Sequence, residues 1–368
     1  MKILEVIASL SPGGGERFVI DLTNEINKDQ NHKIKLLTIK DISYLNCGFY
    51  HKDLNSSIDF QNLKETKFTL LTPFKVLRRI KKNKPDIVHI HLSTTINICI
   101  LAILFYRKPL YVQTLHGRAD KQKISTIDKL IKSIIYKFKL IKLITISDSN
   151  DKSFQDVFKQ KSCGVIYNGR KELDIKKKEI IKNEIEKYKR NNETIVFTHV
   201  ARFHPEKNQS LLINSFNKII EDGVNAILLV IGGGFETEEG KKIKELAGPN
   251  IYFLGLKDNI GDYLVNSDAF VLSSLNEAMP ISLIEALSCR CIPLSTPVSG
   301  SIDIIKNGIN GFLSKDFSQE AFINMIYDFI ENRGKIDKDK IYELYKSQFS
   351  IESCAKKYIS FFENNSKK

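Results

Sequence analysis

Two glutamates, Glu277 and Glu285, are separated by seven residues and lie where a buried strand is expected to pass into a helix. Glu277 follows the apolar run Ala269-Phe-Val-Leu272, and Pro280 suits the first position of a helix that would carry Glu285. Open parallel α/β sheets bind ligands outside the carboxyl ends of their strands, where this loop would lie. Two carboxylates there can accept hydrogen bonds from two sets of hydroxyl groups, while the helix N-terminus between them faces an anion. A nucleotide sugar has that shape.

Two basic residues, Arg202 and Lys207, follow the first expected strand of the second half of the chain, in Val200-Ala-Arg-Phe-His-Pro-Glu-Lys. Both precede an expected helix, so a guanidinium fork and a lysine point charge can converge on one phosphate. The alternative for this segment is a solvated basic turn.

Two glycine runs also separate an expected strand from an expected helix. Glycine permits a tight turn and lets backbone N–H groups approach an anion closely. The later run differs from the dinucleotide-binding fingerprint, because no third glycine stands at the required offset, and a structural turn is an equal alternative there. For the earlier run we favour a ligand role. The two runs are Gly13, Gly14 and Gly15, and Gly232, Gly233 and Gly234.

Three histidines occupy the expected strands of the first half or their ends. His116 ends the strand in Gln113-Thr-Leu-His-Gly, where its ring can hydrogen-bond a sugar hydroxyl or a phosphate. His89 and His91 share one face of a strand, as two metal ligands would, but no third Cys, His or carboxylate is nearby in the sequence. We interpret these two as core or edge histidines.

The one Asp-x-Asp pattern, Asp337-Lys-Asp339, has a spacing that can bind a divalent cation with a nucleotide diphosphate. It lies in a Lys-rich helical tail with no strand before it. We therefore interpret it as solvated surface and predict that no metal is needed.

The elements that must position these residues alternate between apolar β-rich runs and segments of helical period. This pattern predicts an α/β fold with two Rossmann-like domains facing each other across a cleft. The expected strands of the first half are 3–8, 34–39, 87–91, 110–115, 143–147 and 164–167. Those of the second half are 194–200, 226–231, 251–254, 269–272 and 291–295. Expected helices of the first half include 16–28, 73–82 and 127–141.

The expected organisation is an N-terminal domain, a charged linker, a C-terminal domain and a final helix. Their respective boundaries are 1–170, 171–192, 193–348 and 349–368. The net charge of +13 resides in the first domain, because residues 1–170 carry 29 Lys and Arg against 15 Asp and Glu. Such a charge favours an anionic partner, whether nucleic acid, a phospholipid surface or a phosphorylated substrate. Without an aromatic platform or a DNA-binding motif, we expect no nucleic acid.

Cysteine spacing and hydropathy give further expectations. The six cysteines lack the paired spacing of a zinc ribbon or a disulfide scaffold, so we expect reduced thiols, mostly in the core. The first residues form an expected strand with an acidic residue in it, unlike a signal sequence. The longest apolar stretch, 96–106, is too short to span a bilayer. We expect a cytoplasmic protein, with any membrane contact peripheral, on the inner face of the cell membrane.

With these motifs in their order and spacing, the chain resembles retaining glycosyltransferases of family 4, of the bacterial surface-polysaccharide type, which have the GT-B fold. The resemblance covers nearly the whole chain and includes Asn307-Gly-Ile-Asn-Gly311. It implies transfer of a hexose or N-acetylhexosamine from a nucleotide diphosphate sugar, UDP-linked, to a saccharide acceptor with the anomeric configuration kept. The nucleotide sugar is then a donor substrate, and neither a cofactor nor a metal is implied. The final helix would cross back onto the first domain.

The resemblance also implies roles for the residues above. Arg202 and Lys207 would neutralise the leaving diphosphate, where negative charge develops. Glu285 would hold the ribose hydroxyls and Glu277 the hydroxyls of the donor sugar. His116 would meet the sugar or its phosphate, and the first glycine run would approach the diphosphate and acceptor. Backbone groups near Glu277 would help to bind the donor, at Ala278, Met279, Pro280 and Ile281. No protein nucleophile is implied, since the departing phosphate can take the acceptor's proton.

Several positions depart from the family pattern, which affects the expected shape of the sugar pocket. They are Ala278 and Arg290 in place of glycines, Tyr167 in place of proline, and Ser299-Gly300-Ser301 in place of a double glycine.

The expected helix 127–141 has one apolar face, with lysines elsewhere around it. Packing of that face on the sheet is one interpretation; contact with an anionic membrane is the other, and it favours a lipid-linked acceptor. Two other functions remain open at this stage. One is a nucleotide-sugar epimerase of the same fold, and the other is a non-catalytic basic protein that binds a membrane or another anion.

Overall fold

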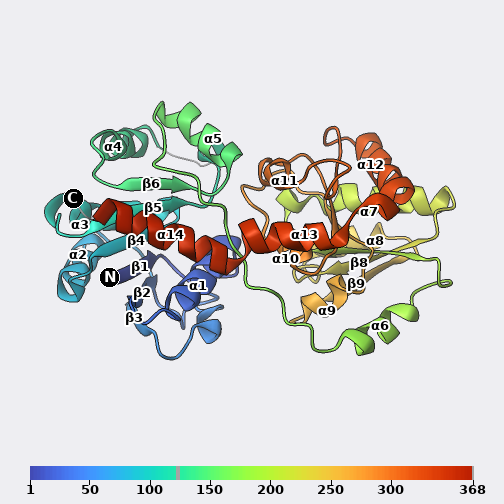
Figure 1. Cartoon of the computed structure of the whole chain (residues 1–368), viewed down its shortest axis with the longest axis horizontal. Helices are drawn as coiled ribbons and strands as arrows, with labels where there is room; N and C mark the ends of the chain where they lie inside the picture. Colours follow the sequence, from blue (N-terminus) through green and yellow to red (C-terminus); the bar gives the residue numbers. More distant parts are fainter. Residues whose placement is uncertain (122–124, 367–368) are drawn as a thin grey trace. The chain divides into compact units, whose positions relative to one another are not determined.

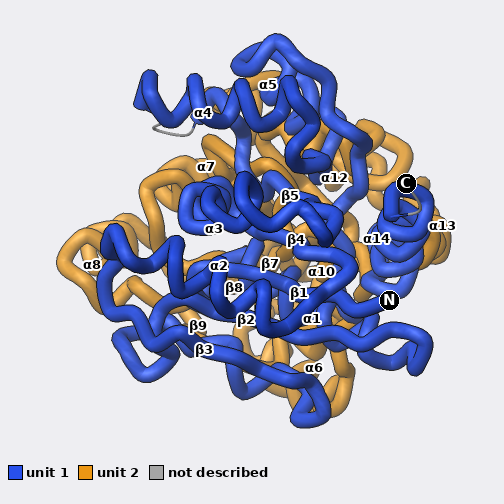
Figure 2. The backbone as a smooth tube through the Cα atoms, turned by 90° about the vertical axis from the view of Figure 1, so that its left-hand side faces the viewer, with its two compact units in different colours: residues 1–171, 348–368 blue, residues 172–347 orange. Residues whose placement is uncertain are grey.

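Each half of the chain forms one six-stranded parallel sheet with helices on both faces (Figure 1). The computed structural model describes residues 1–121 and 125–366. They divide into unit 1, residues 1–171 and 348–368, and unit 2, residues 172–347, as coloured in Figure 2. The last two residues of the expected final helix, 367–368, lie outside the described residues.

Unit 1 has the strand order β3-β2-β1-β4-β5-β6. Its strands are β1 (Lys2–Ile7), β2 (Lys33–Lys40), β3 (Asp59–Glu65), β4 (Ile87–His91), β5 (Leu110–Leu115) and β6 (Lys142–Thr145). Its helices are α1 (Gly14–Ile26), α2 (Thr72–Asn83), α3 (Ser93–Phe105), α4 (Thr126–Lys137), α5 (Asp148–Phe158) and α14 (Ile351–Ser366).

The two faces of this sheet are covered by different helices because side chains alternate along each strand. Leu4 and Val6 of β1 pack in a cluster with α2, α3, α4 and α5. Ile3 and Ile7, from the opposite face, pack with α1 and α14. Glu5 lies between Ile3 and Ile7, so its side chain lies on the face that α1 and α14 cover. The C-terminal helix thus crosses back onto unit 1, as expected.

Unit 2 has the strand order β12-β11-β10-β7-β8-β9. Its strands are β7 (Ile195–Val200), β8 (Ala226–Ile231), β9 (Ile251–Gly255), β10 (Ala269–Leu272), β11 (Ile292–Ser295) and β12 (Phe312–Leu313). Its helices are α6 (Lys178–Glu186), α7 (Gln209–Glu221), α8 (Glu238–Glu245), α9 (Ile260–Leu264), α10 (Ile281–Ser288), α11 (Ser299–Ile304), α12 (Gln319–Asn332) and α13 (Lys338–Leu344).

The structure differs from the expected elements in four places. The segment 171–192 contains α6, whose Ile181 and Ile185 are buried in the core of unit 2, so it is not a separate linker. Residues 164–167 form no strand and make only an isolated bridge, between Val165 and Thr145. Two edge strands were not expected: the polar β3 and the two-residue β12. Among the described residues, no helix combines the length and hydrophobicity needed to cross a bilayer.

Candidate active site

The carboxyl edge of the unit 2 sheet gathers three of the predicted segments. β7 lies between β10 and β8, so the loops that follow these three strands are neighbours. The chain passes from β7 to β8 on one side and later returns to β10 on the other, which makes this the switch point where open α/β sheets bind ligands. Arg202 and Lys207 follow β7, residues 232–234 follow β8, and Glu277 follows β10.

Lys207 and Glu277 are in direct contact. Lys207 Nζ forms an ion pair with Glu277 Oε1, and the Ser274 hydroxyl donates to the same oxygen at 3.0 Å. The two loops are also tied together, since Ser273 Oγ donates to the carbonyl of Lys207 at 2.8 Å. Lys207 is 26% exposed and Glu277 15%. The pair therefore presents a partly exposed cation whose position is fixed by the β10 loop.

The glycine loop after β8 packs directly against the loop that carries Arg202. The backbone N–H of Phe203 donates to the Gly233 carbonyl at 2.8 Å. A Cβ on Gly232 would lie 2.0 Å from the carbonyl oxygen of Ala201, so no larger residue fits there without moving the end of β7. Arg202 itself is exposed, and its guanidinium makes no hydrogen bond or ion pair within 1–121 and 125–366. Gly232 thus has a structural role, in addition to any role in binding.

The second glutamate lies on α10, which begins at Ile281 with Pro280 as its N-cap, one residue later than expected. Glu285 is half-buried there and engaged in an interaction of its own. The backbone N–H of Gly300 donates to the carbonyl of Glu277 at 3.1 Å, and a Cβ on Gly300 would lie 2.6 Å from the carbonyl oxygen of Ala278. This contact positions the turn between the two glutamates. Within the turn, Met279 and Pro280 are buried, whereas Ala278 and Ile281 are half-buried.

In unit 1 the structure brings the first glycine run next to His116. Gly13 is the extended N-cap of α1, which begins at Gly14. A Cβ on Gly15 would lie 3.4 Å from His116 Cγ and 3.0 Å from a methyl carbon of Leu92, so the first turn of α1 packs against the residues that directly follow β4 and β5. His116 Nε2 lies 3.1 Å from His91 Nδ1.

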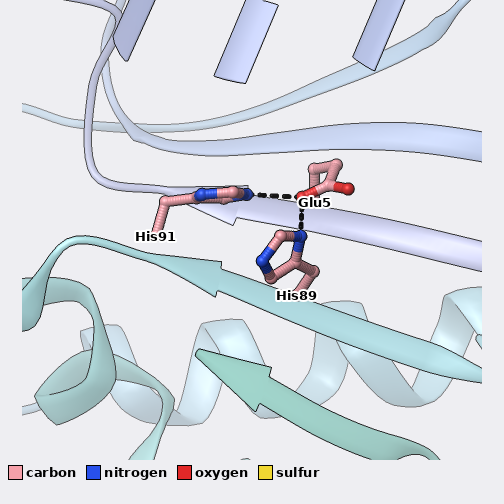
Figure 3. A group of neighbouring side chains, drawn as sticks. All are labelled: Glu5, His89 and His91. Atoms are coloured by element: carbon pink, nitrogen blue, oxygen red, sulfur yellow. Dashed lines mark hydrogen bonds and ion pairs between the residues drawn. The ribbon is translucent and has the colours of Figure 1, made fainter. Parts of the chain in front are cut away.

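Glu5, His89 and His91 form a buried cluster (Figure 3), and His91 of this cluster contacts His116. Glu5 Oε2 is 2.6 Å from His91 Nε2 and 2.9 Å from His89 Nδ1, and all three side chains are fully buried. Two ligands of one tetrahedral zinc, each at about 2.0–2.2 Å, would be more than about 3 Å apart. The 2.6 Å contact is therefore a hydrogen bond. Sequence reasoning missed Glu5, although an acidic residue in an otherwise apolar strand was the available signal.

Burial and the contacts among these side chains shift their pKa values and so determine their charges. Burial would raise the pKa of Glu5, but the two histidine rings outweigh it and lower the pKa to about 2. Burial, with some repulsion from His89, lowers the pKa of His91 to about 4 despite Glu5. Burial and the other two rings lower the pKa of His116 well below its ordinary value. Near neutral pH this site holds an ionised Glu5, with neutral rings at His91 and His116.

Comparison with known proteins identifies the family of the chain. The family described as Glycosyl transferases group 1 matches residues 180–347, and Glycosyltransferase Family 4 matches residues 12–171. Together the two matches include every predicted site residue. The chain belongs to glycosyltransferase family 4. It is an enzyme, which sets aside the non-catalytic alternative.

Relatives of this glycosyltransferase include two curated proteins. The UDP-Gal:alpha-D-GlcNAc-diphosphoundecaprenol alpha-1,3-galactosyltransferase of Escherichia coli is 28% identical over 320 residues, which is 80% of this chain and 75% of that protein. The capsular polysaccharide biosynthesis glycosyltransferase CapH of Staphylococcus aureus is 24% identical over 321 residues, 83% of each chain. The crystal structure of Anabaena HepE in complex with UDP-glucose superposes with a TM-score of 0.81 at 17% identity, covering 99% of this chain and 100% of that one. This likeness shows the GT-B fold.

Helix α4 of the glycosyltransferase leaves most of its predicted apolar face exposed, although Ile135 and the following Ile141 are buried in the core, so packing on the sheet accounts for only part of that face. Its buried residues are Lys132, Ile135 and Tyr136, with Lys132 paired to Asp128 at 2.9 Å. The apolar side chains exposed to solvent are Ile127, Leu130, Ile131, Ile134 and, just after the helix, Phe138. Exposed lysines flank them at Lys129, Lys137 and Lys139.

The remaining predicted features are the Asp-x-Asp pattern and the cysteines. Asp337 caps the N-terminus of α13, and Asp339 pairs with Arg290 at 2.9 Å, so both carboxylates have surface partners. All six cysteines of the glycosyltransferase are free, and only Cys163 is exposed, as expected.

Proposed function

We propose that this glycosyltransferase moves a hexose or N-acetylhexosamine from a UDP-linked donor to a saccharide acceptor in the assembly of a surface polysaccharide. The observation that carries the proposal is the meeting of Arg202, the Lys207–Glu277 pair and the glycine loop at one switch point of unit 2. Two cations and a loop of backbone N–H groups suit a diphosphate, and carboxylates suit sugar hydroxyls. The UDP-glucose complex of HepE and the UDP-Gal named for the Escherichia coli relative support the donor class, and the name of CapH supports a role in polysaccharide assembly.

In this proposal Arg202 and Lys207 stabilise the diphosphate as its bond to the anomeric carbon breaks. Glu285 holds the ribose hydroxyls, and Glu277 holds a hydroxyl of the donor sugar. Glu277 is poorly suited to act as a nucleophile, because its Oε1 already accepts from Lys207 and Ser274. The acceptor oxygen therefore bonds to the same face of the sugar from which the diphosphate leaves, and its proton passes to a departing phosphate oxygen. The anomeric configuration is kept.

Donor binding is testable by thermal unfolding of the purified protein with a panel of UDP-, GDP- and ADP-sugars. A bound donor raises the unfolding temperature with concentration, since it binds only the folded chain. We expect a rise with at least one UDP-sugar and none with that sugar alone. If no nucleotide sugar changes the unfolding temperature, the proposal fails. Proton NMR of the purified product then tests retention, and donor turnover without acceptor would instead indicate the epimerase.

We further propose that the acceptor is lipid-linked and that α4 rests on an anionic membrane. The exposed apolar residues of α4 form a surface that water disfavours, and Lys129, Lys137 and Lys139 beside it complement anionic headgroups. Each such lysine contributes about 1 kcal/mol near an anionic leaflet. The diphosphoundecaprenol named for the Escherichia coli relative supports this acceptor class.

The membrane contact is testable by co-sedimentation with phosphatidylglycerol vesicles and with phosphatidylcholine vesicles. We expect binding to the anionic vesicles alone, lost on Leu130→Gln with Ile134→Gln. The matched control is Ile180→Gln on α6, because Ile180 is also exposed, at 65%, but lies in unit 2. Equal sedimentation of the α4 variant and the wild type would contradict this part of the proposal while leaving donor binding untouched.

A further inference from the structure

The hydrogen-bonded cluster that contacts His116 through His91 determines where each of its protons lies. Glu5 is an ionised carboxylate, which can only accept hydrogen bonds. Its Oε2 contacts His91 Nε2 at 2.6 Å and His89 Nδ1 at 2.9 Å, as the two dashed lines of Figure 3 show. His91 Nε2, which forms a hydrogen bond to the carboxylate, must therefore carry a hydrogen, and the short distance from the carboxylate to His89 Nδ1 favours a hydrogen there as well.

The position of the His91 hydrogen in turn sets the hydrogen of His116. A neutral imidazole has one N–H and one lone pair, so His91 with its hydrogen on Nε2 is an acceptor at Nδ1. His116 Nε2, 3.1 Å away, must then be the donor to that lone pair. A neutral His116 consequently has a bare lone pair at Nδ1.

That second nitrogen of His116 is the one left for a ligand. His116 Nδ1 is buried and has no hydrogen-bond partner within the part of the chain that the structure describes. A buried polar atom without a partner costs about 1–3 kcal/mol, so such an atom beside a ligand loop is typical of a binding site. Gly15, in the first turn of α1 next to that loop, lies against the same ring. A Cβ on Gly15 would be 3.4 Å from His116 Cγ.

On the His89 side of the cluster, the directions of the hydrogen bonds are consistent with these proton positions. His89, with its hydrogen on Nδ1, accepts at Nε2 from the Thr114 hydroxyl at 2.8 Å. Thr114 Oγ1 then accepts from the Tyr358 hydroxyl of α14 at 2.9 Å. Phe18 of α1 and Phe362 of α14 pack their rings against His91 and His89, which keeps water from supplying alternative partners.

We propose that Glu5 and His91 are positioning residues that hold His116 in its Nε2–H tautomer, so that Nδ1 accepts a hydrogen bond from a hydroxyl of a sugar substrate. This rests on the proposed function, in which His116 meets a sugar substrate. It also chooses between the two ligands open to His116 in the sequence. A phosphate needs a donor, and His116 in this tautomer offers only an acceptor at its free nitrogen.

The tautomer is measured directly by two-bond proton–nitrogen NMR correlation of the full chain labelled with ¹⁵N-histidine, at pH 7.5 without substrate. His116→Asn assigns the signals of His116 among those of the seven histidines. We expect a neutral ring protonated at Nε2 in the wild type. A ring protonated at Nδ1, or at both nitrogens, overturns the proposal, and this measurement needs no variant of the buried cluster to fold.

Variants then test the positioning itself. Glu5→Gln and His91→Phe should shift the His116 signals towards the other tautomer or a mixture, whereas His51→Gln, a histidine of unit 1 outside the cluster, should leave them unchanged. Circular dichroism identifies any variant that does not fold. Unchanged His116 signals in folded His91→Phe protein overturn the proposal.

A double-mutant cycle on kcat tests whether His91 acts through His116 or only supports the structure. With the UDP-sugar that binds, His91→Phe should lower kcat about tenfold, the loss of roughly one hydrogen bond. In the His116→Asn background the same change should have little further effect. An equal loss in both backgrounds overturns the proposal. The Nε2–H tautomer in a protein that binds no nucleotide sugar would indicate failure of the proposed function instead.

Discussion

The two units place different chemistry at equivalent positions of the same sheet type. In unit 2 the charged atoms reach the carboxyl edge, where Arg202 is exposed and Lys207 is partly so. In unit 1 the charge at the switch point belongs to Glu5, which is fully buried, and the group that reaches the edge is the neutral ring of His116. Solvent-accessible cations suit a diphosphate whose charge grows during the reaction, whereas a buried neutral acceptor suits a hydroxyl group. The positive charge of unit 1 lies elsewhere, in part beside α4.

Removing a cation from unit 2 is expected to have the largest effect. Lys207→Ala should lower kcat about 10²–10³-fold, as for the loss of one group that stabilises a developing negative charge. The loss of the Lys207–Glu277 ion pair adds to it, because Glu277 would then repel the diphosphate. Transfer assays with a saturating donor measure the effect. Lys218→Ala is the matched control, since Lys218 is an exposed lysine of the same unit paired with Asp222. Activity of Lys207→Ala within threefold of the wild type would contradict the assignment.

The buried cluster makes unit 1 the more acid-sensitive unit. The folded-state pKa of His91 is about 4, so between its ordinary 6.5 and about 4 the unfolded chain binds a proton that the folded chain does not. His116 acts in the same direction, and Glu5 adds a loss between its ordinary 4.5 and about 2. Stability of unit 1 therefore falls as pH falls below 6.5.

Unit 2 has one comparable histidine, His199, whose pKa burial lowers to about 4. Hydrogen exchange at pH 7.5 and 5.0, corrected for intrinsic rates, should show a larger loss of protection in β1 and β4 than in β7 and β8. His91→Phe should reduce that difference. Equal losses in both units would show that the cluster does not dominate the acid response.

Two glycine-to-alanine variants in unit 2 test whether the glycine loop is needed for packing, separately from its proposed role in binding the donor. Gly232→Ala should destabilise the protein by about 1–3 kcal/mol, because the new Cβ would lie 2.0 Å from a backbone oxygen of Ala201 and force strain into the loop. Gly233→Ala, one residue later, would meet only the flexible side chain of Leu256, at 3.2 Å. Urea unfolding midpoints should therefore fall for the first variant far more than for the second. A similar fall for both would mean that flexibility, rather than close approach, requires these glycines.

What the sequence predicts well is what local pattern determines. The apolar runs gave both sheets, and the residue types after β7, β8 and β10 gave the unit 2 site, because neighbouring parallel strands end at the same edge. Two edge strands were missed: β3 is polar and shares little of the core, and β12 has only two residues, too few to show a pattern. The role of Glu5 was missed because its partners, His89 and His91, come from a different strand, 86 residues away in the case of His91. Periodicity likewise predicted an apolar face on α4, but it does not say whether protein covers that face.

The smallest expected effect is on stability, at the residues that directly follow one helix in each unit. Arg290 follows α10 in a left-handed conformation, with φ of 57°, where the family pattern has glycine; Lys159 follows α5 with φ of 54°. A left-handed backbone conformation costs a non-glycine residue about 1–2 kcal/mol. Substitution by glycine removes this cost but also raises the entropy of the unfolded chain, so only part of the cost is recovered as stability. Arg290 offsets this cost through Asp339 and by stacking on Tyr342, with its guanidinium carbon 4.0 Å from the ring centre.

Lys159 is exposed and makes no ion pair among residues 1–121 and 125–366. Lys159→Gly should therefore stabilise unit 1 by about 0.5–1 kcal/mol, whereas Arg290→Gly should change the stability of unit 2 by less than about 0.5 kcal/mol. Urea unfolding followed by hydrogen exchange in each unit measures both. Stabilisation by Arg290→Gly equal to that of Lys159→Gly would mean that the stacked arginine contributes nothing to the end of α10. The departure from glycine at that position would then be a tolerated strain beside the helix that carries Glu285, not a substitution offset by new contacts.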